Sequence, residues 1–210
     1  MSAFEFFFSF YGLLLGFSVA ELVGGFARLL HERKAVRFGL LTPLLAVWVA
    51  VDIATFWNQA WVILRFAPFN FALLVLGLLV ASVFYVAATL VFPRELKAGA
   101  SMDDHFWAHR RMVLLSVLAA NLIMAGLFFI VTGATGEFSA VRFGPVFWIG
   151  LALFISMTLT AALASGRRVV TGALIVLLLY HGFTVSRSVA AIVDQGGWSI
   201  RGPATAEQAS

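Results

Sequence analysis

Two ionisable residues near the middle of long apolar segments are the first candidates for chemistry. Asp52 lies near the centre of the segment 38–64, and His181 lies near the centre of the segment 169–193. A charge at the centre of a bilayer costs roughly 2.5–3.5 kcal/mol on insertion scales, so such a residue needs a functional or structural reason. Either side chain could bind a proton or a cation, and either could instead join neighbouring helices through a hydrogen bond. Their matching depth allows a contact between them.

Two further charged residues, Glu21 and Arg187, lie well inside apolar segments, away from their ends. Glu21 borders a ridge of small residues that permits close approach of another helix. The ridge consists of Gly12, Gly16, Ala20 and Gly24. Arg187 shares a helical face with Tyr180 and Thr184, although its long side chain could also extend to the membrane interface.

Uncharged polar residues extend this set, because Gln59 shares a helical face with Asp52 and Asn121 is central in the segment 112–132. We expect a polar seam between the first, second and sixth segments that passes an ion, protons included, or a small solute. Its members are Glu21, Asp52, Gln59, Asn121, His181 and Arg187. Two other classes stay open. One is a structural or accessory subunit of a larger membrane complex or homo-oligomer, and the other is a small membrane enzyme acting on a lipid-soluble substrate.

The most polar segment, 101–111, has a second set of candidates. His105 and His109 are four residues apart, so both could face one metal ion, with Asp104 as a further ligand. The favoured interpretation is an amphipathic helix end at the interface. There Trp107 would anchor the helix, and Arg110 and Arg111 would contact anionic lipid head groups. No metal site is therefore expected.

The sequence lacks the residues that several kinds of functional site require. The chain has no cysteine, which excludes thiolate metal sites and a cysteine nucleophile. Lys34 and Lys97 both lie between apolar segments, so a buried Schiff base has no attachment point. No glycine-rich phosphate loop occurs. We expect no cofactor and assign no catalytic residue. The net charge of +4 arises in short loops, which argues against a nucleic-acid partner and for membrane lipids.

Six apolar segments must position these residues. The chain is 62% hydrophobic and 11% charged, whereas a soluble domain has about 25% charged residues. A membrane-spanning helix needs about 20 apolar residues. Six segments qualify: 4–30, 38–64, 70–92, 112–132, 144–164 and 169–193. Because backbone groups in lipid must pair internally, we predict an all-α bundle of six transmembrane helices over 1–195, followed by a disordered polar tail over 196–210.

The loop charges predict the orientation. Nine basic residues follow the first, third and fifth segments: Arg33, Lys34, Arg37, Arg94, Lys97, Arg110, Arg111, Arg167 and Arg168. Only Arg65, Arg142 and Arg201 lie in the other loops and the tail. Positive loops favour the cytoplasm, so both termini should lie outside. Trp57, Trp61, Trp148 and Trp198 would then lie at the outer interface and Trp107 at the inner one. The arginine-rich composition suggests the inner membrane of a bacterium.

Ser101 is predicted to begin a helix ahead of the fourth segment. Asp104 lies three residues after it, a weaker form of the capping box. Asp103 and Asp104 also suit the positive end of a helix dipole. We therefore expect one helix from about Met102 into the segment 112–132.

Overall fold

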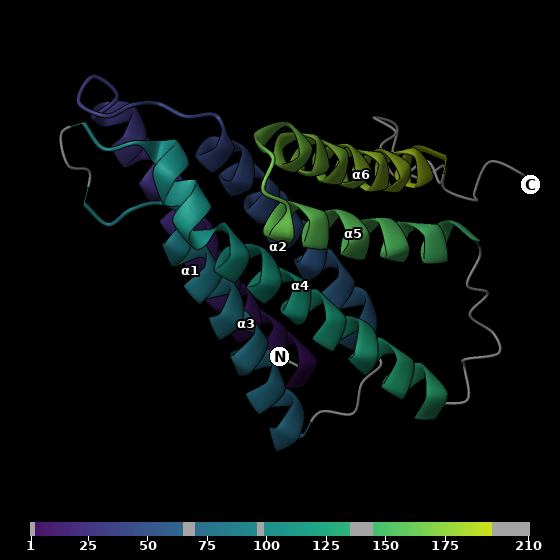
Figure 1. The fold of residues 1–210 in the computed structure, drawn as a ribbon. Helices are drawn as coiled ribbons and strands as arrows, with labels where there is room; N and C mark the ends of the chain where they lie inside the picture. Colours follow the sequence, from purple (N-terminus) through teal and green to yellow (C-terminus); the bar gives the residue numbers. More distant parts are fainter. Residues whose placement is uncertain (1–2, 65–69, 96–98, 135–144, 195–210) are drawn as a thin grey trace, which may run out of the picture.

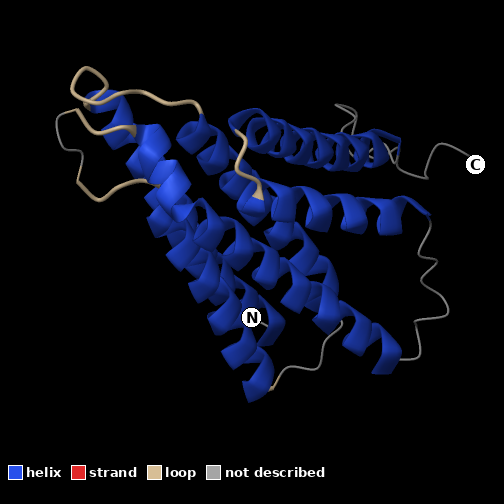
Figure 2. Ribbon diagram, in the orientation of Figure 1, coloured by secondary structure: helices blue, strands red, loops and turns tan. Residues whose placement is uncertain are grey.

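The computed structural model describes residues 3–64, 70–95, 99–134 and 145–194, and these residues form an all-α bundle. Its helices are α1 Ala3–His31, α2 Leu41–Leu64, α3 Phe71–Val91, α4 Met102–Ala134, α5 Pro145–Leu163 and α6 Arg167–Asp194. All six are long and apolar enough to cross a membrane, which confirms the predicted helical segments (Figures 1 and 2). The chain is accordingly a multi-pass membrane protein. The predicted tail at 196–210 and Trp198 lie outside the described residues.

Local sequence signals account for several helix ends. The Asn70 side chain accepts a hydrogen bond from the Leu73 amide at 2.9 Å and caps α3. Ser101 Oγ accepts from the Asp104 amide at 3.2 Å, so α4 begins at Met102 as predicted. Pro145 is the first residue of α5, a position where the missing N–H has no helical partner to lose.

Helices α1 and α3 form one group and α5 and α6 form another, and α2 and α4 pack between the two groups. Helix α1 packs against α3 and α2, while α5 and α6 pack against each other. Helix α4 contacts α2, α3 and α5, and α2 also contacts α6. Figure 1 shows α5 and α6 running obliquely to α1 and α3. Among the described residues the backbone of α1 approaches α2 and α3 but not α4, α5 or α6, a separation that decides which polar residues can meet.

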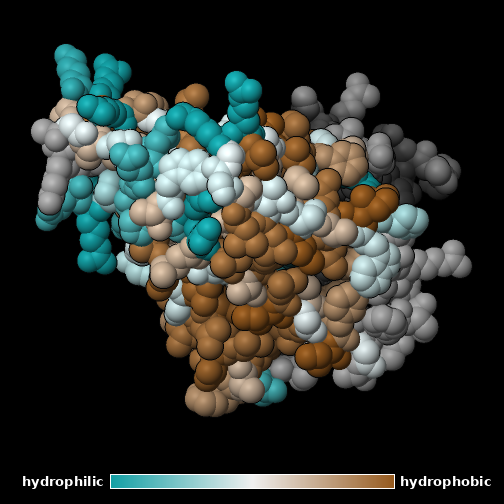
Figure 3. Space-filling view, viewed as in Figure 1, coloured by the Kyte–Doolittle hydropathy of each residue, from teal (hydrophilic) through white to brown (hydrophobic). Residues whose placement is uncertain are grey.

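Three connections gather at one end of the bundle, which we call the basic end: residues 32–40, the described residues 92–95 and 99–101, and residues 164–166. The Arg37 amide donates to the Ala100 carbonyl at 2.9 Å, and the Gly99 amide donates to the Ala35 carbonyl at 2.8 Å. Asp103 forms an ion pair with Arg167 at 2.8 Å, which joins the start of α4 to the start of α6. Figure 3 shows the hydrophilic residues concentrated at this end and a broad apolar surface elsewhere on the same face.

The opposite end contains the expected aromatic residues. Trp57 and Trp61 lie near the end of α2, and Trp148 lies near the start of α5. All three are partly exposed, at 42%, 44% and 50%. This distribution is consistent with an interfacial belt. The basic loops and the tryptophans thus occupy opposite ends, as the loop charges predicted. Which end faces the cytoplasm stays a prediction.

Candidate functional site

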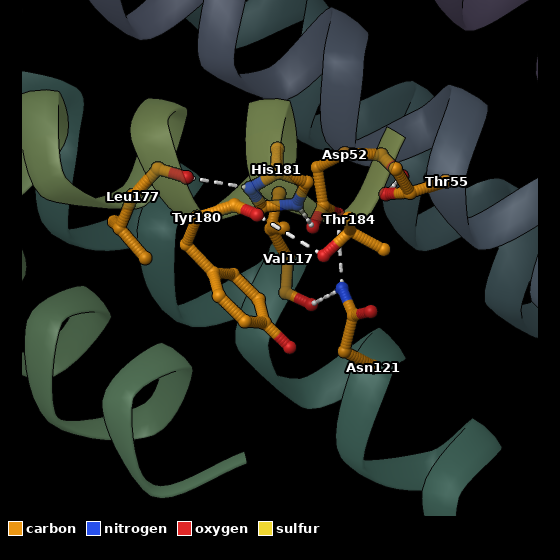
Figure 4. Close-up of polar contacts among 8 residues, drawn as sticks. All are labelled: Asp52, Thr55, Val117, Asn121, Leu177, Tyr180, His181 and Thr184. Atoms are coloured by element: carbon orange, nitrogen blue, oxygen red, sulfur yellow. Dashed lines mark hydrogen bonds and ion pairs between the residues drawn. The ribbon is translucent and has the colours of Figure 1, made fainter. Parts of the chain in front are cut away.

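The carboxyl group of Asp52 is the centre of a buried polar cluster built by three helices. His181 Nε2 on α6 lies 3.2 Å from Asp52 Oδ1, and Asn121 Nδ2 on α4 donates to Asp52 Oδ2 at 2.9 Å. Asp52 and His181 are 1% and 4% exposed, so both are withdrawn from lipid and from bulk solvent. Figure 4 shows His181 and Asn121 pointing toward Asp52 from opposite sides.

The hydrogen bonds define how many protons this cluster holds. His181 Nδ1 lies 2.8 Å from the Leu177 carbonyl oxygen. A carbonyl only accepts, so Nδ1 must carry a proton. At 3.2 Å, Nε2 and Asp52 Oδ1 then need one further proton between them, since two lone pairs would repel each other. The pair therefore holds one exchangeable proton and has no net charge, whether it is a carboxylate with an imidazolium or a carboxylic acid with a neutral imidazole.

The assignment of the Asn121 amide follows from its two neighbours. Its nitrogen faces both Asp52 Oδ2 and the Val117 carbonyl oxygen, at 2.9 and 3.0 Å. Both of these atoms can accept, so the nitrogen and not the oxygen must face them. The amide thus holds the carboxyl group of Asp52 in place from the side opposite His181.

A pocket of about 360 Å³ begins at this cluster. Four helices line it: α2, α4, α5 and α6. The lining residues are Asp52, Thr55, Asn58, Gln59, Asn121, Leu122, Ala125, Phe128, Phe147, Leu151, Phe154, Tyr180, His181 and Thr184. The polar side chains come mainly from α2 and α6, and the apolar and aromatic ones mainly from α4 and α5. The pocket therefore has a polar side and an apolar side.

The pocket opens away from the basic end. Beyond Asp52, α2 adds Asn58 and Gln59, which are exposed, and α6 adds the exposed Thr184 beyond His181. On α5 the lining runs from the buried Phe154 to the exposed Phe147 near the start of the helix. On α2, α5 and α6 the exposure of the lining residues rises toward the end opposite the basic loops. Asp52 and His181 thus form the inner end of the pocket.

A packed layer closes the pocket on its basic side. One helical turn farther on, each of the four helices contributes a side chain with 0% exposure: Trp48, Val117, Thr158 and Leu177. The Trp48 ring stacks on Phe154, with centroids 6.4 Å apart. Trp48 Nε1 and Thr158 Oγ1 have no hydrogen-bond partner among the described residues. We call these four residues the closing layer.

The structure brings together part of the predicted seam. Asp52, Asn121 and His181 are in contact, and Gln59 lines the same pocket. The predicted helices were the first, second and sixth. The pocket is instead formed by α2, α4, α5 and α6. Asn58 and the phenylalanines of α4 and α5 line the pocket but were not among the predicted residues. Asn58 could have been found from its polarity and its position beside Gln59, whereas the phenylalanines carry no such signal in an apolar chain.

Glu21 and Arg187 lie away from the cluster. Glu21 accepts a hydrogen bond from Arg28 at 3.3 Å on the same helix, and the backbone of α1 does not approach that of α4 or α6. The structure therefore does not bring Glu21 together with Asp52 and His181. Arg187 is exposed, does not line the pocket, and has its guanidinium 5.9 Å from the centre of the Phe183 ring. This position agrees with the alternative in which its side chain extends outward.

Arg110 also differs from the expectation. It is 4% exposed, and its guanidinium donates to the carbonyl oxygens of Ala161 and Ala164 at 2.5 and 2.6 Å. It also lies over the Trp107 ring, 4.2 Å from the ring centre. Arg110 therefore binds the end of α5 and is not placed to contact a lipid head group. Arg111 is exposed, so a head-group contact stays a prediction for it.

The two histidines of α4 are engaged with backbone. His105 Nε2 lies 3.0 Å from the Leu90 carbonyl oxygen, and His109 Nδ1 lies 3.0 Å from the His105 carbonyl oxygen. Their rings stack with centroids 4.2 Å apart. In the part of the chain that the structure describes, no group of three or more His, Asp or Glu side chains could hold a metal ion.

The site can thus bind and release a proton at the inner end of a membrane pocket that has a polar and an aromatic side. This arrangement joins one titrating pair to a volume large enough for a small ligand. Comparison of the chain with known protein families, with curated proteins and with solved structures found no match.

Proposed function

We propose that this protein passes an ion, protons included, or a small solute across the membrane, using the pocket between α2, α4, α5 and α6. The observation that carries the proposal is the position of the Asp52–His181 pair at the inner end of that pocket. Ionisable side chains at membrane depth that face a cavity typically mark ion or substrate pathways. A purely structural pair would not need a pocket beside it.

The closing layer supports a mechanism with two states. The pocket reaches Asp52 from one end only, so a solute must wait for Trp48 and Thr158 to separate from their neighbours before it can continue. Their unpaired Nε1 and Oγ1 atoms favour such a change, because a buried polar group without a partner costs about 1–3 kcal/mol. Water entering an opened layer would provide those partners. Alternating exposure of a fixed central site is a common transport mechanism.

The proposed setting is a bacterial inner membrane with both termini outside. The basic end, with its loop arginines and lysine, would then face the cytoplasm. In this orientation the pocket opens to the outside and the closing layer separates Asp52 from the cytoplasm. Labelling of single cysteines, placed in the naturally cysteine-free chain at residues 34 and 142, tests this orientation with an impermeant reagent. Labelling of residue 34 from outside in intact cells would reverse the assignment.

Flux in proteoliposomes tests the function. Asp52→Asn and His181→Gln keep the approximate side-chain size but remove the titrating pair, so proton flux should fall to the level of empty vesicles. Glu21→Gln is the matched control, because it removes a carboxylate that lies outside the pocket and should leave flux unchanged. Unchanged flux in Asp52→Asn would overturn the proposal. A wild-type protein without flux that purifies with a stoichiometric partner would instead support an accessory subunit.

A further inference from the structure

We propose that the pocket binds a monovalent organic cation with an aromatic group, and that this cation displaces the proton held by Asp52 and His181. The inference rests on the proposed function and names the class of solute. It follows from the charge of the pocket, from its aromatic side and from the proton count of the pair.

The charge of the pocket favours a single positive charge. Among the residues that the structure describes, its lining contains one carboxyl group, Asp52, one imidazole, His181, and no lysine or arginine. With the exchangeable proton present, the pair is neutral. Without that proton it carries a charge of −1. A monovalent cation beside Asp52 restores neutrality, which a low-dielectric site strongly favours.

No other charged group in the described part of the chain provides the charge that Asp52 carries. Helix α5 has no titratable residue between Pro145 and Leu163, and α4 faces the pair with the uncharged amide of Asn121. Arg110 is three turns away along α4 and is bound to the carbonyl oxygens of α5. On α6, Tyr180 lines the pocket as a neutral phenol and Arg187 lies outside it. Of the residues that the structure describes, Asp52 and His181 alone therefore decide the charge of the pocket.

The pocket walls select an aromatic cation over a metal ion. Phe128, Phe147 and Phe154 line the pocket, and aromatic rings attract cations through the negative face of the π-system. Phe154 also lies 6.2 Å, between ring centroids, from His181, so an aromatic wall reaches the titrating pair itself. A hydrated inorganic cation would leave this apolar wall unused. A small organic ammonium ion can contact the rings and the carboxylate together.

Cation and proton then compete for one site. Binding of the cation releases the exchangeable proton, and the charge of the site is zero before and after the exchange. Linkage requires the cation to bind more tightly as the proton concentration falls. Below the pH at which the pair loses its proton, the Kd should decrease about tenfold for each pH unit. Passage of the two ions in opposite directions would be an exchange driven by a proton gradient.

Calorimetry with benzyltrimethylammonium tests this inference on the purified full chain. Titrations in two buffers of different ionisation enthalpy should show the release of one proton for each cation bound, and the Kd should tighten with pH. Benzenesulfonate, an aromatic anion of similar size, should not bind. Equal binding of the two compounds, or cation binding without proton release, would overturn the inference.

Two variants locate the site, with one control. Asp52→Asn should weaken cation binding on the order of a hundredfold, because the carboxylate charge is lost. Phe154→Leu keeps an apolar wall but removes the aromatic face, and should weaken binding by roughly three- to thirtyfold. Phe154→Leu keeps the inference testable should Asp52→Asn fold poorly. Glu21→Gln should bind as the wild type does, and a loss as large as that in Asp52→Asn would overturn the placement.

The flux and binding measurements can contradict the proposed function and the cation inference independently of each other. Proton flux that depends on Asp52, without any binding of benzyltrimethylammonium, would overturn the cation inference and leave the proposed function intact. Cation binding with proton release but without flux of either ion would support the binding site and contradict transport.

Discussion

The guanidinium of Arg110 on α4 holds the carbonyl oxygen of Ala161 near the end of α5, at 2.5 Å. A second hydrogen bond joins the same side chain to the Ala164 carbonyl at 2.6 Å. The last carbonyl groups of a helix lack helical partners, and here one buried cation satisfies two of them. Because α5 packs on α6, this contact attaches the α5–α6 pair to the rest of the bundle at the basic end. Toward the other end, the pocket lies between this pair and helices α2 and α4.

Arg110→Met should destabilise the protein. The variant keeps an apolar stem of similar length but removes both hydrogen bonds to α5, and hydrogen bonds to charged groups contribute about 1.5–3 kcal/mol each. The unfolding temperature measured in detergent should fall clearly. Arg111→Met is the control, because Arg111 is exposed and its loss should have little effect. Equal unfolding temperatures for the two variants would show that the α4–α5 contact contributes little.

Asn121→Leu should reduce transport more than stability. Asn121 is the only described side chain other than His181 that hydrogen-bonds the carboxyl group of Asp52. Its loss leaves Asp52 Oδ2 unpaired and free to turn away from His181. One such hydrogen bond contributes about 1–1.5 kcal/mol, so flux should fall roughly five- to tenfold. Flux in proteoliposomes measures this, with Ser82→Ala on α3 as a control for loss of a polar group outside the pocket.

Thr158→Val should separate folding from function. The Thr158 hydroxyl is fully buried without a partner among the described residues, so its replacement by a methyl group of similar size should be neutral or slightly stabilising. If the closing layer must admit water, the same change should lower flux. Thr160→Val is the matched control on α5, since Thr160 donates to the Ser156 carbonyl of its own helix. A stable Thr158→Val protein with wild-type flux would contradict the role given to the closing layer.

Gly39→Ala should destabilise the basic end. A Cβ atom at Gly39 would collide with the carboxylate of Asp103, and it would also approach the Asp103 amide nitrogen at 3.1 Å. Asp103 would have to shift, and its ion pair with Arg167 would weaken. Overpacking of this kind costs about 1–3 kcal/mol, measured as a lower unfolding temperature.

Gly16→Ala provides the opposite case. A Cβ atom at Gly16 meets no atom within 4 Å, so this variant in α1 should be neutral or more stable. A loss of stability as large as that of Gly39→Ala would indicate a partner on the α1 surface.

Sequence patterns predicted several features that depend on one helix at a time. The six helices follow from apolar length because the bilayer imposes it, and the start of α4 follows from Ser101 and its two aspartates. The Asp52–His181 contact was foreseeable because depth in a membrane can be counted along each helix. Depth, however, says nothing about which helices are neighbours.

Only the tertiary structure decided which helices are neighbours. Glu21 was grouped with Asp52 by its burial in an apolar segment, but α1 packs on α3 and α2 and never approaches His181. Arg110 was assigned to lipid from its position at an interfacial helix end, whereas its partners are backbone carbonyls on α5, which carry no signal in residue type. The sequence by itself determined how deep each polar group lies, since hydrophobicity acts on every helix independently. Helix packing decided which of those groups share a pocket, since contacts between helices depend on the shapes of surfaces far apart in the chain.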